Sequence, residues 1–268
     1  MRFIEHRVAD TRVLSLIRKW LKAGVMEDEM FSESEIGTPQ GGSISVLLSN
    51  VCLHYVLDLW FEKQRKKACR GQAYLVRYLD DFVICFQLKS DAEAVRRDIE
   101  ERLGRFGLKL EPEKTKLLNF GRFSSSTACE AQKKAATFNF LGFTFCAGRT
   151  SQGKFLVLLR TEKKRTNRFL QRVRTRLQRI RHKAVQEQAR EINLLLRGHF
   201  RYFGVGGNID ALNRVHRQTV KFWRSVLNTR SQKAKLTWAK MNKILEYSRL
   251  ESPRLSLPYK LMPAMVRL

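Results

Sequence analysis

The sequence predicts an α+β fold in which helices and antiparallel strands come first and an all-helical part follows. Short apolar runs rich in β-branched and aromatic residues lie before residue 160, and Ala73–Arg77 and Phe82–Gln87 are the clearest of them. From Thr161 to near Arg249 the apolar residues instead recur every three or four positions, which is the period of an amphipathic helix. A chain of 268 residues with 43% hydrophobic content can bury a sizeable core and form one or two domains.

The first elements are expected to be a helix, a turn-rich loop and a second, longer helix. Residues 1–24 have a suitable N-cap in Asp10 and a terminating glycine in Gly24. The apolar face of this helix comprises Val13, Leu14, Ile17, Trp20 and Leu21. Residues 37–43, with three glycines and a proline, then lead into a helical pattern over residues 45–66.

The tetrapeptide Tyr78-Leu79-Asp80-Asp81 lies at the tip of a predicted β-hairpin. Both arms are apolar, so we expect them to be buried strands that hold the tip rigidly. Two adjacent carboxylates on a rigid tip suit Mg²⁺, which is usually held by one or two carboxylates together with substrate phosphates. A solvated Asp-Asp turn is the alternative interpretation of the tetrapeptide taken alone.

After the hairpin, Ser90 and Glu93 predict a capping box at the start of a helix that ends before Gly107. The apolar stripe of that helix comprises Val95, Ile99, Leu103 and Phe106. Residues 123–137 have no apolar period and are expected to form a surface loop or linker.

A second hairpin is predicted from Phe138–Phe145 and Phe155–Leu159, with its turn between Gly148 and Gly153. The helical part that follows predicts a small bundle. Its apolar seams are Phe169, Val173, Leu177 and Ile180; Ile192, Leu195, His199 and Tyr202; and Leu212, Val215, Thr219, Trp223 and Val226. The predicted domains are residues 1–122, 123–160 and 161–268.

The net charge of +27, from 52 Lys and Arg against 25 Asp and Glu, is typical of nucleic-acid binding. Arg160–Lys183 holds eleven Lys and Arg and one acid, Glu162, so we expect unpaired cations that contact phosphates. The residues expected to bind RNA are Arg168, Arg172, Arg176, Arg179, Lys183 and Arg197. An anionic membrane is disfavoured because no apolar run approaches the roughly 20 residues needed for a span.

The five cysteines are odd in number and form no C-x-x-C pair, which argues against a disulfide framework or a zinc site. This usage suits a reducing compartment, so we expect the protein to be cytoplasmic.

Five ordered blocks resemble the group II intron reverse transcriptase and maturase family. The blocks are Gly37–Ser43 with Leu47-Leu48-Ser49-Asn50; Arg77–Phe82; Phe106-Gly107-Leu108 through Glu113-Lys114-Thr115; Phe140-Leu141-Gly142-Phe143; and Leu196–Phe200 with Tyr202-Phe203-Gly204. Several blocks in the right order are more specific than any single motif.

The resemblance implies a partial polymerase palm with an antiparallel sheet, followed by a helical thumb or maturase bundle. It implies an RNA-directed DNA polymerase with a splicing role, acting on an RNA template, a DNA primer, dNTPs and intron RNA. Asp80 and Asp81 would hold Mg²⁺ in a two-ion site, and Lys114 would be the general acid to pyrophosphate. The nucleotide and template contacts would be Gly37, Pro39, Gln40, Gly41 and Gly42, and Phe140–Phe143 would be the primer grip.

Family members also carry an earlier strand with a further metal-binding aspartate, and before it a fingers domain. We find neither here, so we expect an amino-terminally truncated member with impaired synthesis. Leu79 stands where the family more often has Ala, and Val46 where Pro is common. A non-catalytic remnant that binds intron RNA as a maturase is the alternative. A general basic nucleic-acid-binding protein with a chance Asp-Asp turn would leave the order of the blocks unexplained.

Overall fold

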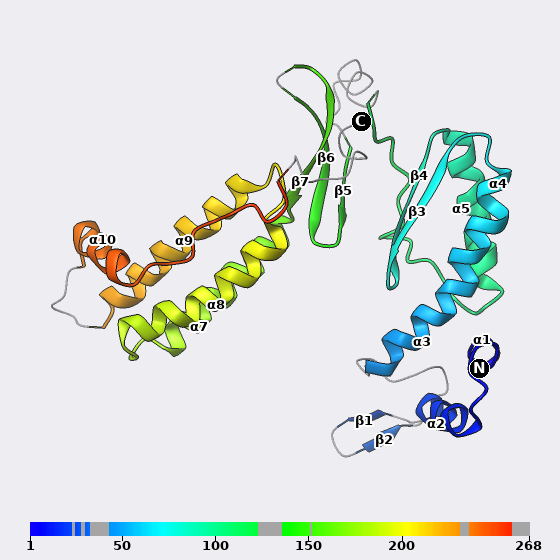
Figure 1. Ribbon diagram of the computed structural model, residues 1–268, viewed down its shortest axis with the longest axis horizontal. Helices are drawn as coiled ribbons and strands as arrows, with labels where there is room; N and C mark the ends of the chain where they lie inside the picture. The colour runs from blue at the N-terminus through cyan, green and yellow to red at the C-terminus, as the bar shows by residue number, and fades with distance from the viewer. Residues whose placement is uncertain are drawn as a thin grey trace. The chain divides into compact units, whose positions relative to one another are not determined.

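The computed structural model describes residues 1–22, 25–27, 30–32, 43–122, 136–150, 152–230 and 236–258 (Figure 1). They form two compact units, Met1–Leu117 and Leu118–Leu268. Helices and small antiparallel sheets occur together, in agreement with the predicted α+β class. The predicted glycine-rich loop at residues 37–42 and most of the predicted linker lie outside the described residues. The three-part domain division stays a prediction.

The elements of the first unit are α1 (Arg2–Glu5), α2 (Thr11–Lys22), β1 (Val25–Glu27), β2 (Met30–Ser32), α3 (Ser43–Leu53), η1 (His54–Asp58), η2 (Phe61–Arg65), α4 (Lys66–Ala68), β3 (Ala73–Tyr78), β4 (Asp81–Phe86) and α5 (Lys89–Gly104). The predicted helix that has Asp10 as its N-cap is confirmed as α2, and the short helix α1 precedes it. Asp10 is confirmed as an N-cap, since its Oδ1 accepts the backbone N–H of Arg12 at 2.8 Å.

Only part of the predicted apolar face of α2 is buried. Leu14 and Ile17 are buried, whereas Val13 and Trp20 are exposed.

The long helix predicted over residues 45–66 is confirmed, and it runs without a break through α3, η1, η2 and α4. Its second half buries Val56, Leu57 and Phe61 in the core of the first unit, against residues of β3, β4 and α5. By length and composition alone, Ile44–Ala68 could cross a membrane, so the expectation that no apolar run approaches that length is wrong. The buried residues of this helix belong to the core of the first unit, and they make up 22% of its most apolar window.

Helix α5 packs beside the β3–β4 hairpin (Figure 1) and begins differently from the prediction. Leu88 is the N-cap, and no side chain caps the first turn, so the predicted Ser90–Glu93 capping box is wrong. The predicted stripe is confirmed for Val95, Ile99 and Leu103, which are buried. Apolar period therefore located the helix correctly, while the local capping signal did not.

The elements of the second unit are β5 (Thr137–Phe140), β6 (Phe143–Arg149), β7 (Phe155–Thr161), α7 (Lys163–Arg179), α8 (Val185–Phe203), α9 (Ile209–Asn228) and α10 (Trp238–Tyr247). The sheet order is β5-β6-β7. The predicted single strand over Phe138–Phe145 is wrong, because Leu141 (φ 51°) and Gly142 (φ 78°) turn the chain between β5 and β6. Left-handed backbone at two successive residues is the geometry of a type I′ hairpin turn.

The predicted helical bundle is confirmed. Helices α7, α8 and α9 pack around one core to which β6 contributes Phe143. Within the predicted seams, the fully buried side chains are Val173, Leu177, Ile192, Leu212, Val215, Thr219 and Trp223. Tyr202, expected in the second seam, is 55% exposed.

Candidate functional site

The tip of the β3–β4 hairpin is a two-residue turn. Tyr78 and Asp81 are the last paired residues, so Leu79 and Asp80 make the turn itself. Leu79 has φ 58°, in the left-handed region, which costs a residue with a Cβ about 1–2 kcal/mol. The predicted hairpin is therefore confirmed, and its tip is a strained turn.

Asp80 and Asp81 are both exposed. Among the described residues neither carboxylate has a hydrogen bond or an ion pair, so both carboxylates are free to bind a cation. The described part contains no cluster of three or more His, Cys, Asp or Glu side chains suited to a metal. The pair fits a divalent ion as far as two carboxylates can, and its remaining ligands would be water and substrate phosphates.

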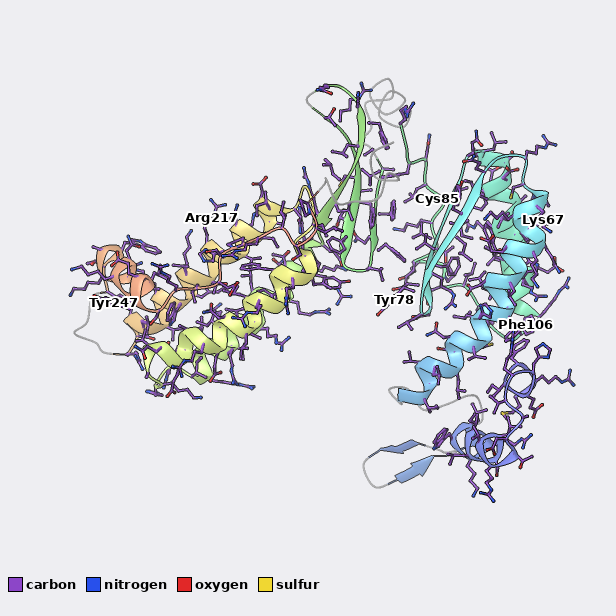
Figure 2. All side chains as sticks on the ribbon, in the orientation of Figure 1. Lys67, Tyr78, Cys85, Phe106, Arg217 and Tyr247 are labelled. Carbon is purple, nitrogen blue, oxygen red and sulfur yellow. The ribbon has the colours of Figure 1, made fainter. Side chains whose placement is uncertain are left out.

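The arms of the hairpin are buried on one face only, which corrects the prediction of fully buried strands. Ala73 is buried and Leu75 half-buried on the face toward the core. On the opposite face Tyr74, Val76 and Tyr78 are 44%, 54% and 59% exposed. Figure 2 shows Tyr78 at the tip end of the hairpin. Because paired residues of antiparallel strands share a face, Asp81 lies on the same exposed face as Tyr78.

The side chain of Arg77 ties the tip to the long helix. Its Nε and Nη2 donate to the two carboxylate oxygens of Asp58, at 2.7 and 2.6 Å. Its Nη1 donates to Oδ1 of Asn50 at 2.8 Å and to the carbonyl oxygen of Leu79 at 2.7 Å. The hydrogen bonds that Arg77 donates to Asp58 raise the pKa of Arg77 further above its ordinary value.

Sequence reasoning missed Asp58. The available signal was its position, eight residues after Asn50 in a long apolar helix, where a carboxylate needs a partner.

The other predicted catalytic and nucleotide-binding residues are not joined to the tip by any described contact. Lys114 is exposed in a turn where its backbone N–H donates to the carbonyl oxygen of Glu111 at 3.2 Å. Residues 37–42, which include Gly37, Pro39, Gln40, Gly41 and Gly42, lie outside the described residues. Their proposed roles stay predictions.

A second site is the basic face of α7 in the second unit. Five arginines recur at intervals of three or four residues, and all five are exposed; they are Arg165, Arg168, Arg172, Arg176 and Arg179. This arginine stripe extends over about 21 Å at the rise of an α-helix. Arg172, Arg176 and Arg179 line an open groove of about 490 Å³ together with Leu194 and Leu195 of α8. The groove combines cations with an apolar wall.

Some of the predicted RNA-binding cations are paired, contrary to expectation. Glu191 of α8 accepts from Arg176 at 2.5 Å and from Lys183 at 2.8 Å. The hydrogen bond from Lys183 and then that from Arg176 lower the pKa of Glu191. Arg197 lies 3.6 Å from Glu251.

Three other cations remain available for phosphates. Arg168, Arg172 and Arg179 have no acidic partner in the part of the chain that the structure describes.

The turn at Leu141 and Gly142 is fixed to the bundle. The hydroxyl of Tyr202 donates to the carbonyl oxygen of Leu141 at 2.9 Å, and the ring of Tyr202 stacks on Phe143. The backbone N–H of Glu162 donates to the carbonyl oxygen of Gly142 at 3.0 Å. Tyr202 thus anchors the turn instead of filling the core.

Comparisons with known proteins give one family match and several partial matches to individual proteins. A family model described as reverse transcriptase (RNA-dependent DNA polymerase) matches residues 2–145. The chain is 31% identical to protein YkfC of Escherichia coli, over 44% of this chain and 38% of that protein. It is 39% identical to the group II intron-encoded protein LtrA of Lactococcus lactis, over 24% of this chain and 11% of that protein. An uncharacterized 91 kDa protein in the cob intron of Schizosaccharomyces pombe is 34% identical over 24% of this chain and 8% of that protein. The chain therefore spans well under half of each relative's length.

Proposed function

Since the chain belongs to the reverse transcriptase family, we propose that it is an RNA-directed DNA polymerase of the group II intron type that also binds intron RNA as a maturase. The match to a group II intron-encoded protein confirms the resemblance seen in the sequence. The observation that carries the proposal is the pair of free carboxylates, Asp80 and Asp81, on a strained hairpin tip.

The proposed reaction joins a dNTP to a DNA primer on an RNA template. The primer 3′-hydroxyl attacks the α-phosphate, a new phosphodiester bond forms, and pyrophosphate leaves. Asp80 and Asp81 would hold divalent ions, and bound Mg²⁺ would stabilise the negative charge on the transferring phosphate. Lys114 would give a proton to pyrophosphate, and Gln40 with its neighbouring glycines would contact the template and nucleotide.

Two carboxylates are few for a two-ion site. We therefore propose that synthesis needs a further carboxylate, from a residue that the structure does not describe or from a segment outside these 268 residues. The chain tested by itself should then extend primers weakly. We also propose that it works in the cytoplasm, in line with its cysteine usage.

The arginine stripe supports the RNA-binding part of the proposal. Arginines at helical spacing contact successive phosphates and position RNA without reading its sequence. Leu194 and Leu195 in the same groove could pack against an unstacked base of a structured RNA. The intron RNA is the proposed ligand because of the relationship to intron-encoded proteins.

Primer extension on an RNA template with Mg²⁺ tests the polymerase. The 268-residue chain should be compared with a version that carries an added upstream strand bearing an aspartate. Extension should be stronger in the longer version and should be lost on Asp80→Asn, but not on Glu246→Gln, which removes an exposed carboxylate on α10. Extension that survives Asp80→Asn would contradict the catalytic assignment.

A second candidate function is RNA binding and splicing assistance without synthesis. It is favoured by one observation: the arginine stripe and the carboxylate pair belong to different compact units. The two candidates separate if both versions of the chain bind intron RNA and promote splicing while neither extends a primer.

A further inference from the structure

The side chain of Arg77 contacts both the long helix, at Asn50 and Asp58, and the hairpin turn, at Leu79. Its guanidinium binds Asp58 with two parallel hydrogen bonds, an arrangement that fixes direction as well as distance. The same group donates to the carbonyl oxygen of Leu79. Only 12% of the Arg77 side chain is exposed, so water competes little with these bonds.

The local geometry of the helix brings the two helical partners of Arg77 together. In a regular α-helix, residues eight apart such as Asn50 and Asp58 are displaced by about 80° around the axis. Residues His54–Asp58 are instead π-helical, with the backbone N–H of Leu59 donating to the carbonyl oxygen of His54. The wider turn reduces that displacement, and both oxygens reach the same guanidinium.

The turn needs such support because Leu79 is held in left-handed backbone at a cost of about 1–2 kcal/mol. A strained residue persists only where surrounding contacts determine its conformation. Arg77 supplies a contact at the carbonyl oxygen of Leu79, which belongs to the peptide group that joins Leu79 to Asp80.

We propose that Arg77, held by Asp58 and Asn50, is a positioning residue that sets the backbone of the turn and so aims the carboxylates of Asp80 and Asp81 at a shared cation. The inference rests on the proposed function for the identity of the site. It assigns Arg77 no contact with substrate or metal.

Electrostatics and positioning predict opposite results for Arg77→Gln. Removing a positive charge near two carboxylates should strengthen cation binding if charge alone matters. If Arg77 positions the pair, the variant should bind a divalent cation roughly tenfold more weakly or worse, as is typical when a supporting residue of a metal site is lost. Whether Arg77→Gln strengthens or weakens cation binding therefore distinguishes a charge effect from a positioning effect.

The first measurement is hydrogen–deuterium exchange of the whole 268-residue chain without metal. Arg77→Gln should speed exchange of the amides at residues 79–82 while the amides of α5 stay protected. The matched control is Arg96→Gln, an exposed arginine of α5 that loses the same charge. Unchanged exchange at the turn would overturn the inference, whatever the metal does.

The second measurement is Mn²⁺ binding followed by water-proton relaxation. The parent and Arg96→Gln should bind alike, Asp80→Asn should lose binding, and Arg77→Gln should be weakened. If Asp80→Asn has no effect, the metal site of the proposed function fails, although the exchange result still decides the role of Arg77. If Asp80→Asn abolishes binding and Arg77→Gln leaves it equal or tighter, the positioning role fails by itself.

A second variant tests whether Arg77→Gln acts only by unfolding the first unit. Arg77→Lys keeps the charge but lacks the planar fork that reaches Asp58 and Leu79 together. It should fold, and it should show the faster turn exchange and weaker Mn²⁺ binding of Arg77→Gln. If both variants unfold the first unit, Arg77 is a stability element and the inference is overturned.

Discussion

The indole Nε1 of Trp223 donates a hydrogen bond of 2.8 Å to Oε1 of Gln188 in the interior of the helical bundle. Both side chains are fully buried. The amide nitrogen of Gln188 donates in turn to the carbonyl oxygens of Ile180, Arg181 and Lys183, at 3.2, 3.1 and 3.1 Å. One glutamine on α8 therefore caps the carboxyl end of α7 and links it to α9.

We expect Gln188→Leu to lower the free energy of unfolding of the bundle by about 1–3 kcal/mol, because it leaves the buried indole N–H of Trp223 and the carbonyl oxygen of Arg181 without partners. The carbonyl oxygens of Ile180 and Lys183 keep hydrogen bonds from the backbone N–H of Lys183 and from Arg230. Urea unfolding should show a lower midpoint at an unchanged slope. The control is Gln186→Leu at an exposed position of the same helix, which should change stability by less than about 0.5 kcal/mol. Equal effects of the two variants would show that the buried network does not contribute.

His199 predicts a loss of stability in acid. Its ring is 6% exposed and stacked on Phe169, and Nε2 has no hydrogen-bond partner among the described residues. Burial lowers the pKa of His199 to about 4 from 6.5. As pH falls below 6.5 the unfolded chain takes up a proton that the folded protein excludes, so stability falls until pH reaches about 4, by roughly 3 kcal/mol in total. His216, whose pKa is also lowered by burial, contributes with the same sign.

The measurement is urea unfolding at a series of pH values between 7 and 5, above the range in which most carboxylates titrate. His199→Phe keeps an aromatic ring against Phe169 and should remove much of the slope. A slope that persists in His199→Phe would assign the effect to other groups.

The arginine stripe predicts how RNA binding depends on salt. Replacing Arg168, Arg172 and Arg179 by Gln should weaken binding to unrelated structured RNAs and flatten the log–log salt slope by about two units, at 0.7–0.9 per phosphate contact. The control replaces Arg96 and Arg97 of α5 and the C-cap residue Arg105 by Gln, which removes the same charge elsewhere. Filter-binding titrations from low to high salt would show this difference, and equal slopes for the two triple variants would exclude the stripe as the binding face.

A change at Glu191 tests the same face of α7, and it should strengthen RNA binding where loss of the arginines weakens it. Glu191→Gln removes a negative charge from the groove and releases Arg176 and Lys183. We expect tighter RNA binding and a steeper salt slope in this variant. Weaker binding would mean that Glu191 is needed to hold the two cations in place for RNA.

Several features were predictable because they depend on local pattern. The β3–β4 hairpin, the Asp10 cap and the buried seam through Val173 and Leu177 follow from strand alternation, a side-chain oxygen near free N–H groups, and helical period. The turn at Leu141 and Gly142 was missed, because an apolar run conceals a turn that only backbone angles reveal.

In the predicted sites, too, the features that depend on local pattern were the predictable ones. The sequence was sufficient to place Asp80 and Asp81 together at one tip, since two adjacent residues of a hairpin cannot be far apart. It was also sufficient to put the arginines of α7 on one face, because their spacing matches the helix. Both features are local and need no knowledge of the rest of the chain.

The tertiary structure alone decided which charges have partners. Arg77 meets Asp58 across 19 residues, and Arg176 meets Glu191 across 15, through the packing of separate elements. It also decided that one face of the β3–β4 hairpin is exposed while the other packs on the core. Sequence period sets the face of an element on which a residue lies, but the partner of that face depends on how the elements pack, and this is a property of the whole fold.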